Sequence, residues 1–130
     1  MGYEPYTYIP TESEEQQMIF QWAAYMEGRV PELKLLHHVP NGGYRVPATA
    51  SRMKSEGVKA GVPDICLPVS MHGQCGLYIE LKKRDRSNRP TRLQKWWIDA
   101  LQEQGYAAYV AYGADEAIGI IKEYLEITDE

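Results

Sequence analysis

The sequence predicts an α/β fold in which helices flank one mixed β-sheet. Three observations lead to this expectation. Apolar residues recur at helical spacing in three long segments, they alternate with polar residues at 77–83, and turn-forming residues separate the segments. The predicted order is helix, strand, short helix, strand, strand, helix, strand, helix. Strands interleaved with helices in this way are typical of a mixed sheet with helices on its faces.

The first helix is expected from about Thr11 to Glu27. Two capping boxes are available for its first turn, Thr11 with Glu14 and Ser13 with Gln16. The apolar residues that recur at helical spacing behind them are Met18, Ile19, Trp22, Ala23 and Met26. This helix should therefore bury one face.

A strand, a turn and a short helix are expected next. Leu33–Val39 is apolar enough for a strand, and Pro40–Gly43 has the composition of a turn. Ala48–Glu56 is then expected to form a short helix, which Gly57 stops.

Two strands joined by a hairpin loop are expected in the centre of the chain. In Asp64–Val69, alternation places Asp64 on the opposite face from the apolar residues. In Leu77–Lys83, alternation places Glu80 and Lys82 together on one face.

The last third of the chain predicts helix, strand and helix. The first of these helices should begin near Pro90–Thr91 and end at Gly105. Its predicted buried stripe contains Leu93, Trp96, Trp97, Ala100 and Leu101. Tyr106–Tyr112 is expected to be a covered strand, and Asp115 is expected to cap the final helix. The inward residues predicted for that helix are Ala117, Ile118, Ile121, Tyr124 and Leu125.

Composition favours one globular domain over residues 1–130 in a reducing, cytoplasmic compartment. The chain is 44% hydrophobic and 25% charged, and no segment approaches the roughly eighteen apolar residues of a membrane span. No basic region followed by an apolar one marks a secretory signal at the N-terminus. Cys66 and Cys75 form no CxxC pair, so a structural zinc site is not expected, and the three histidines are interpreted as strand and turn residues.

The net charge of −4 conceals a strong asymmetry. Residues 45–95 hold eleven Lys/Arg and four Asp/Glu, a net of +7, whereas the flanking segments 1–44 and 96–130 have nets of −4 and −7. A cationic segment in an acidic chain indicates a localised site for a polyanion. The alternative is a solvated basic loop, and charge alone does not separate the two.

Asp64, Glu80 and Lys82 have the spacing of a catalytic group. Glu80 and Lys82 lie two residues apart on one strand, so their side chains point the same way, about 7 Å apart. Asp64 begins the neighbouring strand if the loop closes a hairpin, and two carboxylates then converge beside an ammonium group. Carboxylates in small number suit Mg²⁺, which activates water and polarises a phosphoryl oxygen. A solvent-facing Glu-x-Lys pair with a turn aspartate is the alternative, but order, spacing and the adjacent cations favour phosphodiester hydrolysis.

These residues also carry a family resemblance. "GVPD" followed after a hairpin by "LYIELK" resembles the core of the PD-(D/E)XK nuclease superfamily. The order of "SEEQQMIFQWAAYM", "PNGG", "EGVKAGVPDICLPV", "GLYIELK", "LQKWWIDALQEQGY" and "YGADEAIGIIKEYL" is similar to the virus-type replication-repair nuclease (VRR-NUC) family, from about Ser13 to Leu125. The resemblance implies a restriction-endonuclease-like mixed sheet flanked by helices and suggests a stand-alone, phage-type member, which would act in the host-cell cytoplasm.

The resemblance also implies roles for particular residues. The family's metal-binding acids fall on Asp64 and Glu80, with the Leu81 backbone carbonyl completing the site for Mg²⁺ or Mn²⁺. Its active-site lysine falls on Lys82. A family glutamate falls on Glu15, holding metal directly or through water, and a family glutamine falls on Gln94, near the start of the second long helix. Glu15 shares the apolar line of its helix, which favours it over Glu14 for the site, although an acid favoured by the helix dipole is the alternative. Gln94 is alternatively a good helix former on the edge of the apolar stripe.

Two groups of cations are candidate DNA contacts. The first follows the Glu80 strand and consists of Lys83, Arg84, Arg86, Arg89, Arg92 and Lys95. The second edge consists of Arg45, Arg52, Lys54 and Lys59. Only Asp85 lies near Arg84, Arg86 and Arg89 in sequence, so these arginines are expected to be free for phosphates. No residue is an obvious reader of base sequence, and recognition of DNA shape is expected.

The expected function is that of a metal-dependent DNA endonuclease. Small size and the family resemblance favour a homodimer, whose twofold symmetry suits a four-way (Holliday) junction. A nickase or flap endonuclease is the close alternative, and a catalytically silent DNA-binding module is the alternative from another class. The silent module needs the cations but not Asp64, Glu80 and Lys82 together.

Overall fold

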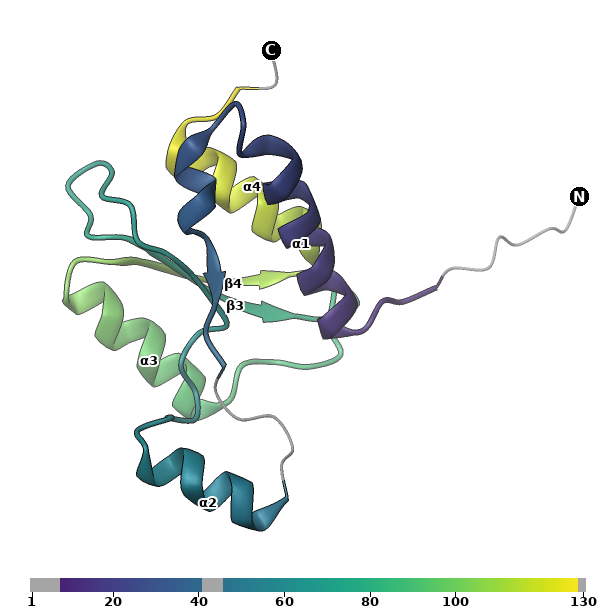
Figure 1. Cartoon of the computed structure of the whole chain (residues 1–130), viewed down its shortest axis with the longest axis vertical. Helices are drawn as coiled ribbons and strands as arrows, with labels where there is room; N and C mark the ends of the chain where they lie inside the picture. The colour runs from purple at the N-terminus through teal and green to yellow at the C-terminus, as the bar shows by residue number, and fades with distance from the viewer. Residues whose placement is uncertain (1–7, 41–45, 129–130) are drawn as a thin grey trace, which may run out of the picture.

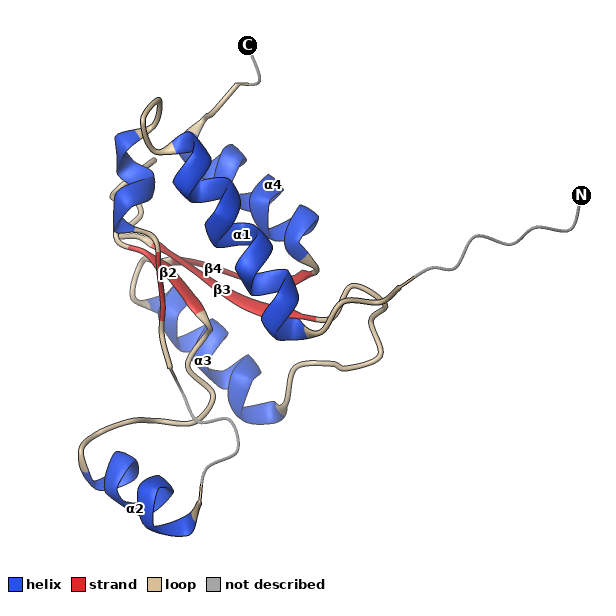
Figure 2. Cartoon of the chain, turned by 45° about the vertical axis from the view of Figure 1, so that its right-hand side comes forward, coloured by secondary structure: helices blue, strands red, loops and turns tan. Residues whose placement is uncertain are grey.

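The computed structural model describes residues 8–40 and 46–128 and contains a mixed four-stranded sheet with helices on both faces (Figures 1 and 2). The elements in chain order are α1 (Glu12–Met26), a 3₁₀ helix η1 (Pro31–Leu35), β1 (His37–His38), α2 (Pro47–Ser55), β2 (Ile65–Leu67), β3 (Leu77–Lys82), α3 (Arg92–Glu103), β4 (Ala107–Tyr112) and α4 (Ala114–Leu125). The predicted α/β class and mixed sheet are confirmed.

The sheet has the order β1-β2-β3-β4. β1 pairs with β2 and β2 with β3 in antiparallel fashion, the latter through the predicted hairpin loop. β4 runs parallel to β3, and α3 makes the crossover between them. A parallel pair needs such a long connection, so α3 is placed on one face of the sheet.

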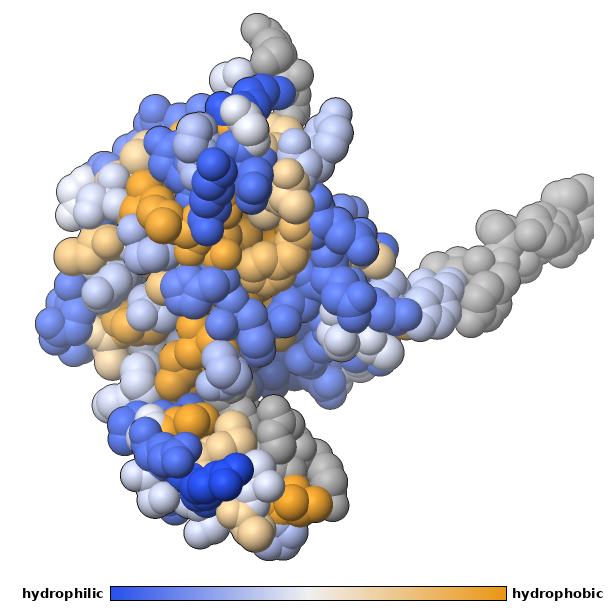
Figure 3. Space-filling model, viewed as in Figure 1, coloured by the Kyte–Doolittle hydropathy of each residue, from blue (hydrophilic) through white to orange (hydrophobic). Residues whose placement is uncertain are grey.

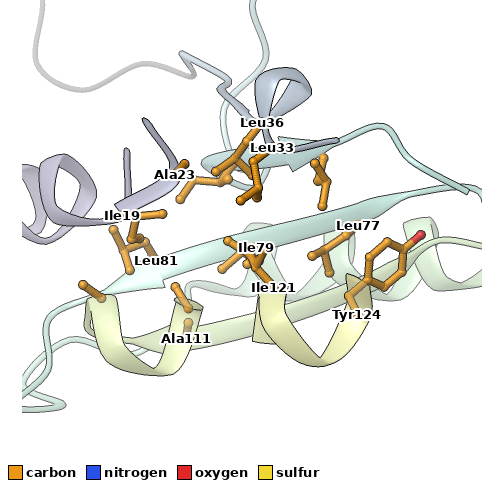
Figure 4. Close-up of a cluster of buried hydrophobic side chains, with 14 of the residues drawn as sticks. Ile19, Ala23, Leu33, Leu36, Leu77, Ile79, Leu81, Ala111, Ile121 and Tyr124 are labelled. Carbon is orange, nitrogen blue, oxygen red and sulfur yellow. The ribbon is translucent and has the colours of Figure 1, made fainter. Parts of the chain in front are cut away.

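The core lies between the sheet and the α1/α4 layer on its other face (Figures 2 and 4). Ile79 and Leu81 of β3 point into this layer, where they meet Ile19 of α1 and Ile121 of α4 (Figure 4). Alternation along β3 therefore turns Glu80 and Lys82 to the opposite face, away from the apolar cluster.

The first helix begins at the capping box of Thr11 and Glu14. The Thr11 hydroxyl accepts from the Glu14 N–H, and the Glu14 carboxylate accepts from the Thr11 N–H. The other candidate, Ser13, instead accepts from Gln17. A box starting at Thr11 leaves Glu15 at the first inward position of α1.

The predicted strand Leu33–Val39 is wrong over its first half. Pro31 opens the 3₁₀ helix η1, and only His37 and His38 pair with β2. Leu33 and Leu36 are both buried, at the threefold spacing of a 3₁₀ helix. A short apolar run fits a strand or a buried helical turn equally well, and the proline decides between them.

The predicted buried stripe of α3 is wrong for Leu93 and Trp96, whereas Trp97, Ala100 and Leu101 are half-buried. Leu93 and Trp96 are 47% and 59% exposed, and Ile98 is the buried residue of the helix. The sheet is narrow, so it covers only part of the apolar face of α3.

Two expectations for the end of the chain are also wrong. Tyr109, at the centre of the strand that was expected to be covered, is exposed, and α4 is preceded by Gly113 and not by Asp115. Of the inward residues predicted for α4, three are buried and Ile118 and Leu125 pack partly against the core.

Helix α2 projects from the body at the end of the sheet where β1 ends and β2 begins (Figures 1 and 2). It has no buried residue. In the space-filling view this projection carries strongly hydrophilic side chains beside apolar ones (Figure 3). No helix in residues 8–40 and 46–128 is long and apolar enough to cross a membrane.

Substitution of the two candidate caps tests which box begins α1. Thr11→Ala should lower the free energy of unfolding by about 1 kcal/mol, because the Glu14 N–H loses its acceptor. Ser13→Ala, the matched control, should change it by no more than about 0.5 kcal/mol. Urea unfolding of both variants measures the difference, and equal losses would contradict this assignment.

Candidate active site

Asp64 lies where β2 and β3 separate. The antiparallel ladder pairs Ile65 with Ile79, and beyond this pair the Asp64 carboxylate takes over as the acceptor: its Oδ2 atom accepts from the Leu81 N–H at 2.8 Å. On its other side, the Asp64 backbone carbonyl accepts from the Val39 N–H at 2.7 Å and from His38 Nδ1 at 2.8 Å. Asp64 is thus held from β3 and from the end of β1 together.

Glu80 and Lys82 share the face of β3 that alternation assigns them. Both are nearly buried, with exposed fractions of 2% and 7%. The Lys82 Nζ atom lies 3.7 Å from Glu80 Oε2. The second oxygen, Glu80 Oε1, is buried without a hydrogen-bond partner in the described part of the chain. An unsatisfied buried carboxylate oxygen is costly and calls for a ligand.

The electrostatics of the pair show that Glu80 and Asp64 lie close together. Burial, followed by the negative charge of Asp64, raises the pKa of Glu80 to about 8, and Lys82 only partly opposes the rise. Burial also raises the pKa of Asp64, against the opposing hydrogen bond from the Leu81 N–H. Two carboxylates with raised pKa values and an orphaned oxygen leave room for additional positive charge.

This donor set fits a hard divalent cation. Mg²⁺ commonly takes one or two carboxylates and keeps several waters. A cluster of three or more His, Cys, Asp or Glu side chains suited to a metal does not occur among the described residues. Any ion here would therefore be held by Asp64 and Glu80 with backbone, water or substrate oxygens.

Glu15 is fully buried and held in a separate network. Its Oε2 atom accepts from Arg84 Nε at 2.7 Å, and its Oε1 atom accepts from Arg84 Nη2 at 2.8 Å and from the Ala114 N–H at 3.0 Å. The Arg84 hydrogen bond is the main reason why the pKa of Glu15 is lowered. The network joins α1, the loop after β3 and the start of α4.

Gly113 makes this network possible. Its φ of +94° favours glycine, and a Cβ atom there would lie 2.8 Å from Arg84 Cβ and 3.5 Å from Glu15 Oε2. The backbone between β4 and α4 therefore approaches the Glu15–Arg84 pair more closely than a side chain would permit.

Gln94 forms the capping box of α3 with Thr91. Its Oε1 atom accepts from the Thr91 N–H at 2.9 Å, and its own N–H donates to the Thr91 hydroxyl at 3.1 Å. The sequence interpretation missed this role, although Thr-x-x-Gln is the signal of a capping box. The structure brings Asp64, Glu80 and Lys82 together, while Gln94 caps a helix and Glu15 pairs with an arginine.

The basic residues divide into two classes. Contrary to expectation, Arg84 and Arg86 have acidic partners: Arg84 pairs with Glu15, and Arg86 pairs with Glu116 at 2.9 Å and lies over the Tyr112 ring. Both partners are distant in sequence, so local charge counting could not find them. In the described regions, no carboxylate lies within 4.0 Å of the other candidates, Arg52, Lys54, Lys59, Lys83, Arg89, Arg92 and Lys95. Arg45 lies outside the described residues.

His38 is a neighbour of the site that the sequence interpretation missed. Because a carbonyl only accepts, its hydrogen bond to Asp64 makes His38 Nδ1 the protonated nitrogen and leaves Nε2 as the acceptor. Its position at the end of a predicted strand carried no further signal, and the turn predicted at 40–43 lies largely outside the described residues.

Two carboxylates, Glu80 buried and Asp64 half-buried, beside a lysine where two strands separate, with exposed cations nearby, are the features of a nuclease domain. Comparison with known proteins agrees. Over residues 10–115 the sequence matches the VRR-NUC domain, and the chain belongs to this family of nuclease domains. A solved structure titled "VRR_NUC domain protein" is 34% identical, with a TM-score of 0.77 over 95% of this chain and 94% of that one. No curated protein gives a significant match.

The Glu15–Arg84 pair predicts a large stability loss for Arg84→Ala. A broken buried pair costs about 3–5 kcal/mol, and about 2 kcal/mol or more is expected here because Arg84 is 39% exposed. Arg86→Ala, the matched control, breaks an exposed pair and should cost about 1 kcal/mol or less. Denaturant unfolding of both variants measures the contrast.

The Arg84→Ala penalty should also depend on pH. The pKa of Glu15 is lower in the folded chain than in the unfolded chain. The pair therefore stabilises the fold fully when the pH is above the pKa of Glu15 in the unfolded chain, and this stabilisation is lost as the pH falls through the pKa in the folded chain. The penalty should therefore shrink in acid. A penalty as small as that of Arg86→Ala at neutral pH would contradict the proposed importance of the network.

Proposed function

We propose that the chain is a Mg²⁺- or Mn²⁺-dependent endodeoxyribonuclease with a PD-(D/E)XK-type site, selective for branched DNA such as four-way junctions. One observation carries the proposal: Glu80 Oε1 is buried and unpartnered beside Asp64, with Lys82 on the same strand face. By resemblance we further assign it to the stand-alone, phage-type members, acting in the host-cell cytoplasm.

Asp64 and Glu80 would hold the metal, together with the Leu81 carbonyl. The Leu81 N–H already points to Asp64, and the N–H and C=O of a strand residue lie on the same edge of the strand. When bound, the ion lowers the pKa of a coordinated water and polarises the phosphoryl oxygen. The two carboxylates, which Lys82 compensates only in part, would then have a further counter-charge.

Lys82 would supply the second part of the chemistry. Its ammonium group is held near Glu80 and remains next to the position of the incoming phosphate. There it orients the attacking water and offsets the negative charge that grows on the phosphate as one P–O bond forms and the other breaks. Water adds across a single phosphodiester bond, so no further reactant is needed.

Glu15 and Gln94 would assist from the edge of the site. Glu15 contributes to a metal, directly or through water, only after exchanging one of its bonds with Arg84, since both of its oxygens are engaged. The Gln94 amide nitrogen has no partner within the described ranges, so it is free to donate to a phosphate or to the attacking water.

The exposed cations would bind the DNA backbone without reading its sequence. Arg52 and Lys54 lie on the projecting helix α2, and Arg92 and Lys95 lie on α3. Lys59, Lys83 and Arg89 complete the two groups in the described residues, and Arg45, outside them, belongs to the second group by sequence. Phosphate contacts of this kind position a protein on DNA and make its affinity depend on salt.

An enzyme accounts for the buried acids better than a silent DNA-binding module does. A module that only binds phosphates has no use for a buried and a half-buried carboxylate beside its cations, because they cost desolvation energy and repel DNA. A nickase or flap endonuclease would use the same residues and differs only in the substrate.

Metal ions should be obligatory for cleavage. With EDTA, cutting of branched DNA should vanish while binding persists, because the cations that contact phosphates are separate from Asp64 and Glu80. Mg²⁺ or Mn²⁺ should restore cleavage, and Ca²⁺ should support binding with little cleavage. Gel assays of cleavage and binding in each condition measure this, and full activity in chelator would refute the mechanism.

The matching variants are Asp64→Asn, Glu80→Gln and Lys82→Ala. Each should lower turnover by about a hundredfold or more while the fold survives, because these side chains lie outside the apolar core. Asp99→Asn, on an exposed turn of α3, is the control that should cut normally. A folded Glu80→Gln protein with normal activity would remove Glu80 from the mechanism.

A twofold dimer should cut four-way junctions by paired incision. One small domain grips a short length of duplex, whereas two related sites match the two equivalent strands of a junction. Sedimentation should show a dimer, and a cruciform plasmid should become linear within one binding event. A monomer that accumulates open circles would favour the nickase and leave the metal-dependent chemistry intact.

A further inference from the structure

We infer that Trp96 is a stacking platform for a DNA base exposed at a branch, and that it gives the proposed nuclease its preference for branched over plain duplex DNA. The inference rests on the proposed function, because it takes DNA as the ligand. Its basis is an apolar surface that the fold leaves uncovered on α3.

Trp96 is exposed although the sequence would place it in the core. It is 59% exposed, and Leu93, one turn earlier, is 47% exposed. Trp22 and Trp97, by contrast, are half-buried. A large aromatic side chain on the surface of a single domain indicates a binding surface when other features gather around it.

The ring of Trp96 is held in a defined orientation. It packs edge-to-face against Trp97, with ring centroids 5.6 Å apart and planes at 89°. Trp97 is itself anchored, because its Nε1–H donates to the Ala60 carbonyl at 3.2 Å. A preorganised aromatic ring loses little freedom when a base stacks on it.

The neighbours of Trp96 fix the start of α3 to the backbone that leads to Asp64. A Cβ atom on Gly61 would lie 2.7 Å from Leu93 Cγ and 3.0 Å from Trp97 Cδ1, so this part of α3 packs tightly on segment 60–61. That segment leads within a few residues to Asp64. The platform and the catalytic acid are therefore fixed to one short stretch of backbone.

Charge identifies the ligand as a nucleic acid. Arg92 lies one helical turn before Trp96, Lys95 is adjacent, and Arg89 lies in the loop before the helix. In the described chain none of the three has a carboxylate within 4.0 Å, even though Asp99 lies on the following turn. Cations interleaved with an aromatic ring are the chemistry that binds phosphates and stacks bases.

A second copy of the chain fits this surface less well. In a twofold contact centred on Trp96, Arg92 and Lys95 would meet the same residues of the partner, and like charges would oppose each other. The cores of protein interfaces are also depleted in charged residues. The occupant that satisfies both the ring and the cations is an unstacked base with its phosphates.

Such a platform discriminates between DNA shapes. A plain duplex keeps its bases stacked inside the helix, whereas a branch point exposes unpaired or unstacked bases. Stacking one of them on Trp96 adds affinity only for the branched form, and the cations contribute to both forms equally.

The test compares Trp96→Ala and Trp96→Phe with the unaltered chain, using Ca²⁺ so that binding is measured without cleavage. The probes are a plain duplex and a splayed duplex of equal length with 2-aminopurine as the first unpaired base. Trp96→Ala should weaken binding to the splayed DNA by about five- to a hundredfold, the range of one base–aromatic stack, and change duplex binding by less than about twofold. Trp96→Phe should retain most of the difference.

Quenching of 2-aminopurine fluorescence reports stacking itself, which a merely structural role would not change. The unaltered chain should quench it, and Trp96→Ala should not. Tyr25→Ala is the matched control, since Tyr25 is an 86% exposed aromatic residue on α1, which packs on the other face of the sheet, and it should behave as the unaltered chain. In cleavage assays with Mg²⁺, Trp96→Ala should raise KM for splayed DNA and leave kcat nearly unchanged.

Three results would overturn the inference. Equal affinities of Trp96→Ala and the unaltered chain for splayed DNA would show that the ring does not contact the base. Loss of a dimer in sedimentation of Trp96→Ala would make this face a protein interface. If the unaltered chain binds neither probe, both this inference and the proposed function fail. If the chain binds and cleaves DNA equally well with and without Trp96, only this inference fails and the proposed function stands.

Discussion

The site depends on one local constraint, the separation of β2 from β3 just beyond the Ile65–Ile79 pair. At that point Asp64 leaves the ladder, and its carboxylate rather than its backbone accepts the Leu81 N–H. The hydrogen bond holds the half-buried Asp64 near the buried Glu80 side chain. Like charges so placed are unfavourable in a low dielectric, and Lys82 compensates for only part of the cost.

The surrounding fold keeps this unfavourable arrangement in place. Packing of α1 and α4 on β3 fixes the strand, and the Glu15–Arg84–Ala114 network ties the loop just after Lys82 to both helices. Helix α2 projects without a buried residue, and α3 covers the other face of the sheet with Ile98 buried. The main apolar cluster thus lies on one face of the sheet, and the exposed sides of α2 and α3 carry cations that are available for DNA.

Patterns of short range could be predicted from the sequence, and contacts of long range could not. Alternation in β3 and the position of Asp64 before β2 placed Asp64, Glu80 and Lys82 correctly relative to the sheet. Arg84 looked free because its partner Glu15 lies 69 residues away. The apolar residues of α3 have helical spacing, as predicted. Which of them are buried depends on the width of the sheet, and the sheet leaves Trp96 uncovered.

Thermal unfolding with increasing Mn²⁺ tests most directly the claim that the Asp64–Glu80 pair is a cation site. An ion that binds only the folded chain raises Tm as the concentration of the ion increases. The account predicts such a rise for the unaltered protein and little or none for Glu80→Gln, which in chelator should be at least as stable because one of two repelling carboxylates is gone. The same rise in both proteins, or none in either, would contradict it.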